Sequence, residues 1–127
     1  MSYLLDTHTL IWYFEDSPNL SKEVIDLIDD ALNNKCICSV SLWEIAIKKN
    51  IGKLKLKLSL EELLTETRNS DLKILQIEDT HLKRLSELPF LHKDPFDRLI
   101  IAAAIAEKMT IITIDENIQK YDVPWIW

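Results

Sequence analysis

Four acidic residues lie where this chain passes between short apolar runs and helical patterns. Asp6 and Asp115 each follow an apolar run, and Glu44 and Asp97 each lie near the start of a helical pattern. Carboxylates gathered at one place repel one another, so at neutral pH they share protons or bind a cation. A hard divalent ion such as Mg²⁺ takes oxygen ligands, and it can hold a phosphate and activate a water. If the fold brings the four acids together, the expected chemistry is metal-assisted phosphodiester hydrolysis.

The segment that begins at Asp94 predicts the central helix. Pro95 suits the first helical position, because its missing N–H is not needed there, and Asp94 is a natural N-cap. The run 99–106 is apolar around the whole helix, which predicts a buried helix. Asp97 lies three residues after Asp94, so both carboxylates lie near one face of the first turn. We expect Asp97 at the start of a buried helix, with Asp94 as its cap or as an outer acid of the same site.

The rest of the chain alternates between strand-like and helical patterns. Strands are predicted at 3–5, 36–40, 72–77 and 110–114, with a short edge strand in the tail, 123–127. Helices are predicted at 10–14, 21–32, 41–50 and 78–88, and one more begins at 59. This order predicts the α/β class: a single domain over residues 1–127, with a short, central, mainly parallel sheet flanked by helices. Sites in such sheets form outside the carboxyl ends of the strands, where Asp6 and Asp115 are expected.

Composition narrows the class of protein. The net charge of −6 argues against a protein that coats nucleic acid, although a nuclease with a local basic strip remains compatible. The single glycine, Gly52, excludes glycine-rich phosphate loops and the serine nucleophile elbow. Cys36 and Cys38 are expected to be buried, reduced thiols, because cysteines so spaced on a strand are poorly placed for a disulfide. No apolar run can cross a bilayer and no signal-peptide pattern is present, so a cytoplasmic location is expected.

Each acid also has an ordinary structural explanation. Ser41 and Glu44 have the spacing of a capping box. The helix dipole favours Asp97 in a first turn, Asp115 could cap the segment that follows it, and an acid after a strand, such as Asp6, is common in loops. A capping carboxylate keeps a second oxygen, so these roles do not exclude ligation. No histidine is assigned as a catalytic base.

Neighbours of the acids are candidates for supporting roles. Thr7 and Thr113 could orient the acids or a bound water, or their hydroxyls could satisfy local backbone. Arg98 could hold a carboxylate, contact a phosphate or form a structural ion pair. Lys48 and Lys53 belong to the densest basic run of the chain, which could attract RNA phosphates or form a solvated helix end and loop.

Ordered motifs spanning nearly the whole chain resemble one known family. The motifs are Leu5-Asp6-Thr7-His8, Ser41-Leu42-Trp43-Glu44-Ile45 with Lys48 and Gly52-Lys53-Leu54, His92-Lys93-Asp94-Pro95-Phe96-Asp97-Arg98, and Thr113-Ile114-Asp115 with Ile118 and Tyr121. Together they resemble the PIN-domain family, and specifically the VapC-like ribonuclease toxins of bacterial type II toxin–antitoxin pairs.

The resemblance implies a metal-dependent endoribonuclease with RNA as its substrate. It further implies a cognate antitoxin that blocks the site, and pairing of the toxin as a homodimer. By the same resemblance, Mg²⁺ or Mn²⁺ would be held by four acids: Asp6, Glu44, Asp97 and Asp115. Ala103 stands where many relatives of this subgroup carry glutamine, and Ile114 differs within the last motif. Neither difference removes one of the implied ligands.

Other function classes remain open from the sequence. A non-catalytic module could keep the PIN-like fold and bind RNA or protein without turnover. Aspartate-nucleophile phosphatases also begin with a strand that ends in aspartate, but they need a second acid two residues later, where this chain has His8. A receiver-type phosphorylation switch is less suitable, because no lysine follows the strand at 110–114 at a suitable place.

Overall fold

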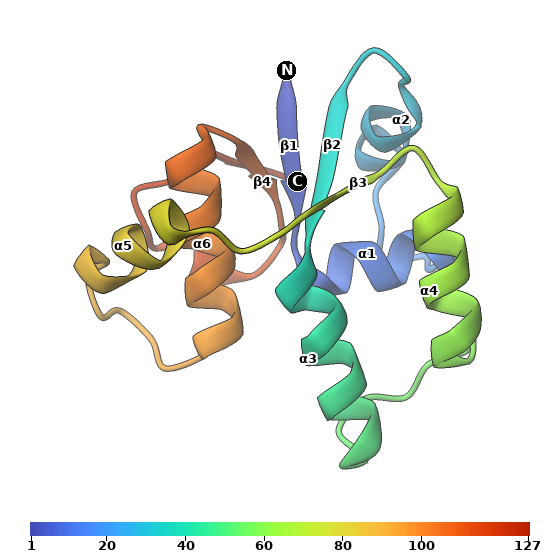
Figure 1. Ribbon diagram of the computed structural model, residues 1–127. Coiled ribbons are helices and arrows are strands. Elements are labelled where there is room, and N and C mark those ends of the chain that lie inside the picture. Colours follow the sequence, from blue (N-terminus) through green and yellow to red (C-terminus); the bar gives the residue numbers. More distant parts are fainter.

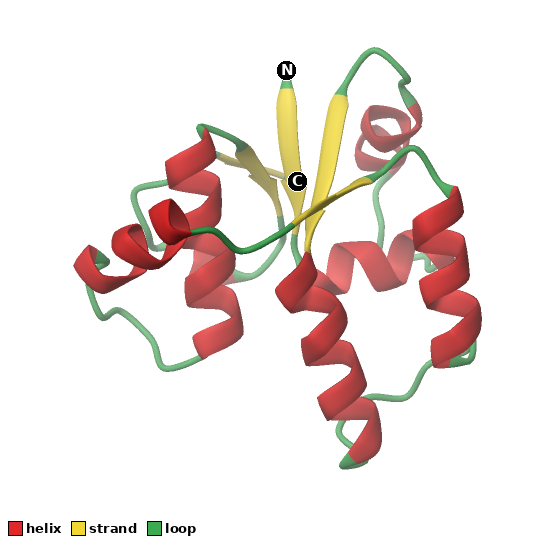
Figure 2. Cartoon of the chain, viewed as in Figure 1, coloured by secondary structure: helices red, strands yellow, loops and turns green.

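The strands form one parallel sheet with helices on both faces, in a computed structural model that describes residues 1–127 (Figures 1 and 2). Neighbouring strands are all parallel, in the order β3-β2-β1-β4-β5. The strands are β1 (Ser2–Leu5), β2 (Asn34–Cys38), β3 (Lys73–Leu75), β4 (Thr110–Ile112) and β5 (Trp125–Ile126). The helices are α1 (Thr7–Phe14), α2 (Lys22–Asp29), α3 (Ser39–Asn50), α4 (Leu60–Asn69), α5 (Asp79–Glu87), α6 (Pro95–Glu107) and α7 (Glu116–Gln119). The predicted α/β class with a flanked parallel sheet is confirmed.

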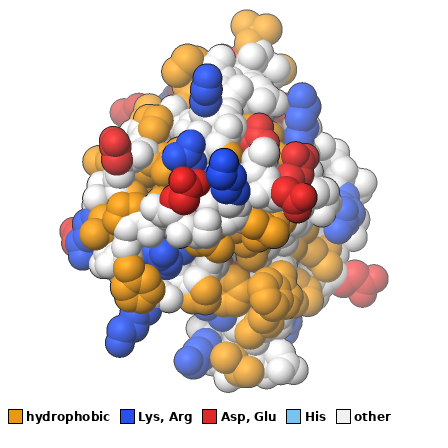
Figure 3. Space-filling view, turned by 60° about the vertical axis from the view of Figure 1, so that its left-hand side comes forward, with side chains coloured by type: hydrophobic (Ala, Val, Ile, Leu, Met, Phe, Trp, Pro, Cys, Tyr) orange, Lys and Arg blue, Asp and Glu red, His pale blue; other side chains and the backbone are white.

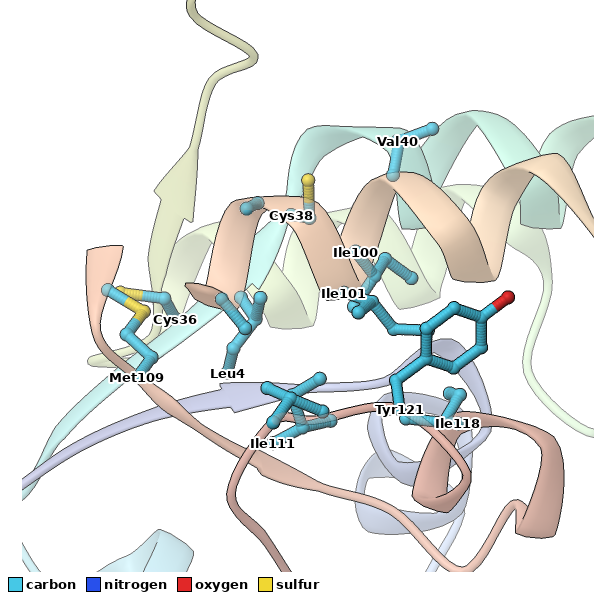
Figure 4. Packing of buried hydrophobic residues seen from close by; sticks show 13 residues of the cluster. Leu4, Cys36, Cys38, Val40, Ile100, Ile101, Met109, Ile111, Ile118 and Tyr121 are labelled. Carbon is cyan, nitrogen blue, oxygen red and sulfur yellow. The ribbon is translucent and has the colours of Figure 1, made fainter. Parts of the chain in front are cut away.

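Alternate residues of β1 enter two separate hydrophobic clusters. Leu4 packs with residues of β2, β4, α6 and α7 on one face of the sheet (Figure 4). Tyr3 and Leu5 pack with residues of α1, α2 and α4 on the other face. Side chains of a strand alternate between faces, so one short strand serves both clusters. Figure 1 shows the same division, with α5 and α6 on one side and α1, α2 and α4 on the other. Both faces are covered, which explains the apolar character of the strands.

The boundary between β2 and α3 differs from the prediction. Helix α3 begins at Ser39, and its N-cap is Cys38, which makes no side-chain cap hydrogen bond. The predicted capping box of Ser41 and Glu44 is therefore wrong. Ser41 lies inside the helix and is fully buried, with its hydroxyl oxygen 3.0 Å from that of Thr7. A side chain used in that contact is not available to cap the helix.

Helix α2 also ends earlier than predicted, and a buried lysine donates hydrogen bonds to carbonyls at its end. Asp30 is its C-cap, and Asp30 Oδ1 accepts a hydrogen bond from the Leu32 N–H at 2.9 Å, which turns the chain out of the helix. Lys35, in β2, is only 1 % exposed. Its ammonium donates to the carbonyls of Ile28 at 2.7 Å and Asp30 at 3.1 Å, and to Asp71 Oδ2 at 2.6 Å. These partners make burial of the charge possible.

The predicted beginning of α6 is confirmed. Asp94 Oδ1 accepts a hydrogen bond from the Asp97 N–H at 3.0 Å, and Pro95 occupies the first turn. The interior of the helix is fully buried from Ile100 to Ala104. The predicted edge strand in the tail is β5, which pairs with β4. None of the seven helices combines the length and apolarity needed to span a membrane.

Candidate functional site

Parallel pairing of β1 with β4 brings Asp6 beside Thr113. Leu5 pairs with Ile112, so the residues that follow the two strands emerge at the same edge of the sheet. The Thr113 hydroxyl donates to Asp6 Oδ2, and Asp6 Oδ1 accepts from the Thr9 N–H at 2.8 Å. Asp6 is thus both the N-cap of α1 and a carboxylate held by a strand end. Burial raises its pKa, while the hydrogen bonds from Thr113 and Thr9 act in the opposite direction.

Glu44 projects inward from α3 and is held at both of its oxygens. The Thr7 hydroxyl lies 2.6 Å from Oε1, and the Lys48 ammonium pairs with Oε2. Because a carboxylate only accepts, the Thr7 proton is directed to Glu44. The Glu44 side chain is 2 % exposed and that of Lys48 28 %, so this ion pair lies at the margin of the interior. Burial lowers the pKa of Lys48, but the hydrogen bond and charge of Glu44 prevail and leave it raised.

Asp97 is a second acid whose ionisation its surroundings oppose. Its side chain is 15 % exposed, and the pKa is raised from 3.8 to about 8. Burial is the largest cause, followed by the negative charges of Asp94, Asp115, Glu44 and Asp6, in that order. Asp97 therefore experiences the field of all the predicted site acids, which come from four separate parts of the chain.

Asp115 completes the group from the end of β4. Its N–H donates to the Thr113 hydroxyl oxygen at 2.9 Å, and its Oδ1 accepts from the Asn117 N–H at 2.8 Å, as the N-cap of α7. Thr113 thus bridges the acids at positions 6 and 115. Asp94 caps α6 in the same way, so the structural role proposed for each of these two acids is present. In each case the second carboxylate oxygen makes no protein hydrogen bond.

The donor set fits a hard divalent ion in chemistry, although the acids are not drawn tightly together. No three histidine, cysteine, aspartate or glutamate side chains lie close enough to hold a metal ion as they stand. The acids instead have individual protein partners: Thr113 contacts Asp6 and Asp115, Lys48 contacts Glu44, and His92 contacts Asp97. All four acids are carboxylates, the donors that Mg²⁺ and Mn²⁺ accept. A bound cation would replace repulsion by attraction at this group.

The predicted basic candidates have different surroundings. Arg98 forms no ion pair: it donates to the Pro89 carbonyl at 2.8 Å and the Tyr121 hydroxyl at 3.0 Å, and its guanidinium lies 4.8 Å from the centre of the Phe90 ring. It therefore holds the loop between α5 and α6. Lys53 is exposed in the loop after α3, and its side chain makes no hydrogen bond or ion pair.

Aromatic side chains adjoin the acids. Trp43, next to Glu44 on α3, is 61 % exposed and contacts the Phe96 ring edge-on, with ring centres 5.3 Å apart. The Lys48 ammonium lies 5.8 Å from the centre of the same Phe96 ring. Hydrophobic side chains gather widely on the side of the molecule that carries α5 and α6 (Figure 3). Trp43 and Phe96, the residues next to Glu44 and Asp97 in the sequence, therefore pack against each other beside the acids.

Two residues that contact the site were not assigned a role from the sequence. His92 Nε2 lies 3.2 Å from Asp97 Oδ2, and His92 Nδ1 lies 2.8 Å from the Tyr121 hydroxyl. His92 precedes α6 in a loop, so helical periodicity could not link it to Asp97. Both residues belong to the ordered motifs quoted above, and that was the only signal in the sequence that marked them.

Comparisons with solved structures support the architecture. VapBC2 from Rickettsia felis, bound to a DNA fragment from its promoter, is 21 % identical, with a TM-score of 0.74 over 99 % of this chain and 98 % of that one. DNA-bound VapBC from Salmonella typhimurium is 18 % identical, with a TM-score of 0.72 over 99 % and 97 %. A toxin-antitoxin complex from Klebsiella pneumoniae is 20 % identical, with a TM-score of 0.59 over 89 % and 86 %. At these identities the likeness is one of fold.

A comparison with curated proteins gives no match. The family model described as PIN domain matches residues 3–124, from β1 to just before β5. That range includes all four acids, the threonines that hold two of them, and the Asp94–Asp97 turn. The chain belongs to the PIN domain family.

Proposed function

We propose that this protein is a metal-dependent endoribonuclease and the toxin of a toxin–antitoxin pair. The observation that carries the proposal is the electrostatic coupling of Asp97 to Asp94, Asp115, Glu44 and Asp6. A carboxyl whose pKa is raised first by burial and then by several neighbouring carboxylates is costly for folding, and such sites are often functional. Membership of the PIN family and the likeness to VapBC structures favour the same interpretation.

The proposed role of each site residue follows from its contacts. Asp6, Glu44, Asp97 and Asp115 would hold Mg²⁺ or Mn²⁺ through carboxylate oxygens. Such an ion supplies charge stabilisation for a phosphate and lowers the pKa of a water. Thr113 fixes Asp6, and Thr7 fixes Glu44, so that their carboxylates need little reorganisation.

The proposed substrate is RNA, whose phosphates need positive charge near an otherwise acidic group. Lys53 and its neighbours in the loop after α3 are exposed, and in our proposal they contact the RNA backbone. Lys48 instead neutralises Glu44 at the edge of the site. Asp94 would shape the field around Asp97 from outside the ligand set, and Arg98 would act through the α5–α6 loop.

The proposed partners are a cognate antitoxin, which would cover the acids, and a second copy of the chain in a homodimer. We propose a cytoplasmic setting, where RNA is available. The similarity to a structure described as a toxin-antitoxin complex, from Klebsiella pneumoniae, motivates the antitoxin assignment. Co-purification from the native host and mass measurement of the complex would test both partners.

The direct test is cleavage of a panel of structured RNAs, including tRNAs, with Mg²⁺, with Mn²⁺ and with EDTA. Wild type, purified free of antitoxin, runs beside Asp97→Asn, Asp6→Asn and a control, Glu66→Gln. Glu66 is exposed on α4 and its side chain makes no hydrogen bond or ion pair, so the control loses the same charge away from the site.

We expect discrete products from wild type and the control, only with a divalent ion, and none from the two site variants. Equal products from wild type and Asp97→Asn would refute the assigned mechanism, because the cleavage would then come from a contaminating nuclease or from other residues. Tight RNA binding without cleavage in every lane would favour a non-catalytic PIN module instead. A phosphoryl group trapped on Asp6 would favour the phosphatase alternative.

A further inference from the structure

The Tyr121 hydroxyl is the centre of a hydrogen-bond network beside Asp97. It lies 3.2 Å from the Leu91 backbone nitrogen, 3.0 Å from Arg98 Nη1 and 2.8 Å from His92 Nδ1. Tyr121 is 4 % exposed, and its ring belongs to the hydrophobic cluster shared by β4, α6 and α7. Figure 4 shows the ring against Ile101 and Ile118, with the hydroxyl directed out of the cluster. Packing of the ring therefore fixes the position of the oxygen.

These contacts determine where the hydrogen atoms lie. A backbone N–H and a guanidinium can only donate, so Leu91 and Arg98 both use the Tyr121 oxygen as their acceptor. The one acceptor within reach of the hydroxyl proton is His92 Nδ1. Nδ1 then carries no proton, and a neutral imidazole has its single proton on Nε2. Nε2 lies 3.2 Å from Asp97 Oδ2, to which it donates.

We propose that Tyr121 and His92 form a positioning pair that fixes one carboxylate oxygen of Asp97 and leaves the other for a divalent cation. Asp97 Oδ1 makes no hydrogen bond to the protein, whereas Oδ2 is held by His92. Tyr121 holds the imidazole by two contacts, because the two rings also pack edge-on with centres 5.4 Å apart. The buried Tyr121 thus determines the tautomer of His92, and His92 in turn fixes the orientation of the Asp97 carboxylate.

The expected effect on cation binding rests on the proposed function, whereas the assignment of the His92 tautomer rests on the hydrogen bonds alone. Groups that orient a metal ligand typically change metal affinity by about 10–100-fold when they are removed. We expect His92→Ala to weaken Mg²⁺ binding within that range. His92→Gln keeps an amide N–H at similar reach and an amide oxygen for Tyr121, so it should recover part of the loss. A residue with a merely structural role would show no such rescue.

The first measurement needs no metal and no substrate. Long-range ¹H–¹⁵N correlation spectra at alkaline pH in EDTA report which nitrogen of the neutral His92 ring is protonated. We expect the Nε2–H form in wild type and a mixture of both tautomers in Tyr121→Phe, which keeps the packed ring. Tyr13→Phe is the matched control: it removes a hydroxyl that contacts Asp29 at 2.5 Å, far along the chain from His92, and should leave the spectrum unchanged. An Nδ1–H form in wild type would overturn the inference.

The second measurement is calorimetric titration with Mg²⁺, after circular dichroism has verified that each variant is folded. Weaker binding by His92→Ala and Tyr121→Phe, with unchanged binding by Tyr13→Phe, would support the positioning pair. If wild type bound Mg²⁺ and His92→Ala bound it with the same affinity, the positioning pair would be refuted, whereas the metal site would still be supported. If wild type itself bound no divalent ion, the metal site would be refuted, and with it the purpose proposed for the pair.

Discussion

Replacement of Asp97 by asparagine should make the protein more stable at neutral and alkaline pH. The pKa of Asp97 is about 8 in the folded chain, against an ordinary value of 3.8. Between these values the folded state binds more protons at this residue than the unfolded state does. Stability therefore falls as pH rises through this window, by at most about 1.4 kcal/mol per pH unit. At pH 7 the accumulated cost has an upper bound of about 4 kcal/mol, and partial exposure of the side chain reduces it to on the order of 2 kcal/mol.

The assay is urea unfolding in EDTA at pH 5, 6, 7 and 8, with wild type, Asp97→Asn and Glu66→Gln compared. Asparagine cannot ionise, so the stability advantage of Asp97→Asn over wild type should grow from pH 5 to pH 8. Glu66→Gln, an exposed carboxylate exchanged for its amide, should show no comparable growth. Saturating Mg²⁺ should then stabilise wild type more than Asp97→Asn, because a cation favours the ionised carboxyl. A difference between wild type and Asp97→Asn that stays constant across pH would refute the electrostatic argument.

Three further predictions concern residues that hold the fold and the site. Lys35→Met should lower the free energy of unfolding by about 2–4 kcal/mol, measured by urea denaturation, because two carbonyls and a carboxylate lose their donor; a loss below about 0.5 kcal/mol would contradict this. Lys48→Met should cost about 1–3 kcal/mol in EDTA, and Mg²⁺ should restore more stability to it than to wild type, because Glu44 loses its only cation; equal responses to Mg²⁺ would count against Glu44 as a ligand. Thr113→Val removes a hydrogen bond that lowers the pKa of Asp6, so stability should decline more steeply with rising pH than in wild type, and parallel pH profiles would exclude that contribution.

The sequence predicted the elements whose signals are local. Pro95 and Asp94 specify the start of α6 from neighbouring residues alone, and the structure confirms that start. The apolar runs before Asp6 and Asp115 predicted strands that end at one edge of a parallel sheet. Where a signal was local but weak, tertiary packing prevailed: Ser41 had the spacing of a cap and instead became a buried helical residue beside Thr7.

What could not be predicted depends on contacts between distant segments. The link from Tyr121 through His92 to Asp97 joins the turn that follows α7 to the loop before α6, and no periodicity within one element reveals it. The partner of Lys48 was closer, one helical turn away at Glu44, yet the sequence offered RNA phosphate and solvent as its alternatives. The acids could be proposed from the sequence because they follow apolar runs or lie near the starts of helices. The groups that contact these acids could be identified only from the three-dimensional structure.

The contacts around the acids also explain why this chain tolerates so much gathered negative charge. Each interior carboxylate has a distinct compensation: threonine and backbone donors at Asp6, a lysine and a threonine at Glu44, and a histidine at Asp97. These partners do not keep every pKa low, because burial raises the pKa of Asp6 and raises that of Asp97 to about 8. The charge state of Asp97 should therefore respond to a bound cation, and binding near neutral pH should release close to one proton from it. Calorimetry in buffers of different ionisation enthalpy would count that proton directly, and a release that persisted in Asp97→Asn would assign it to another residue.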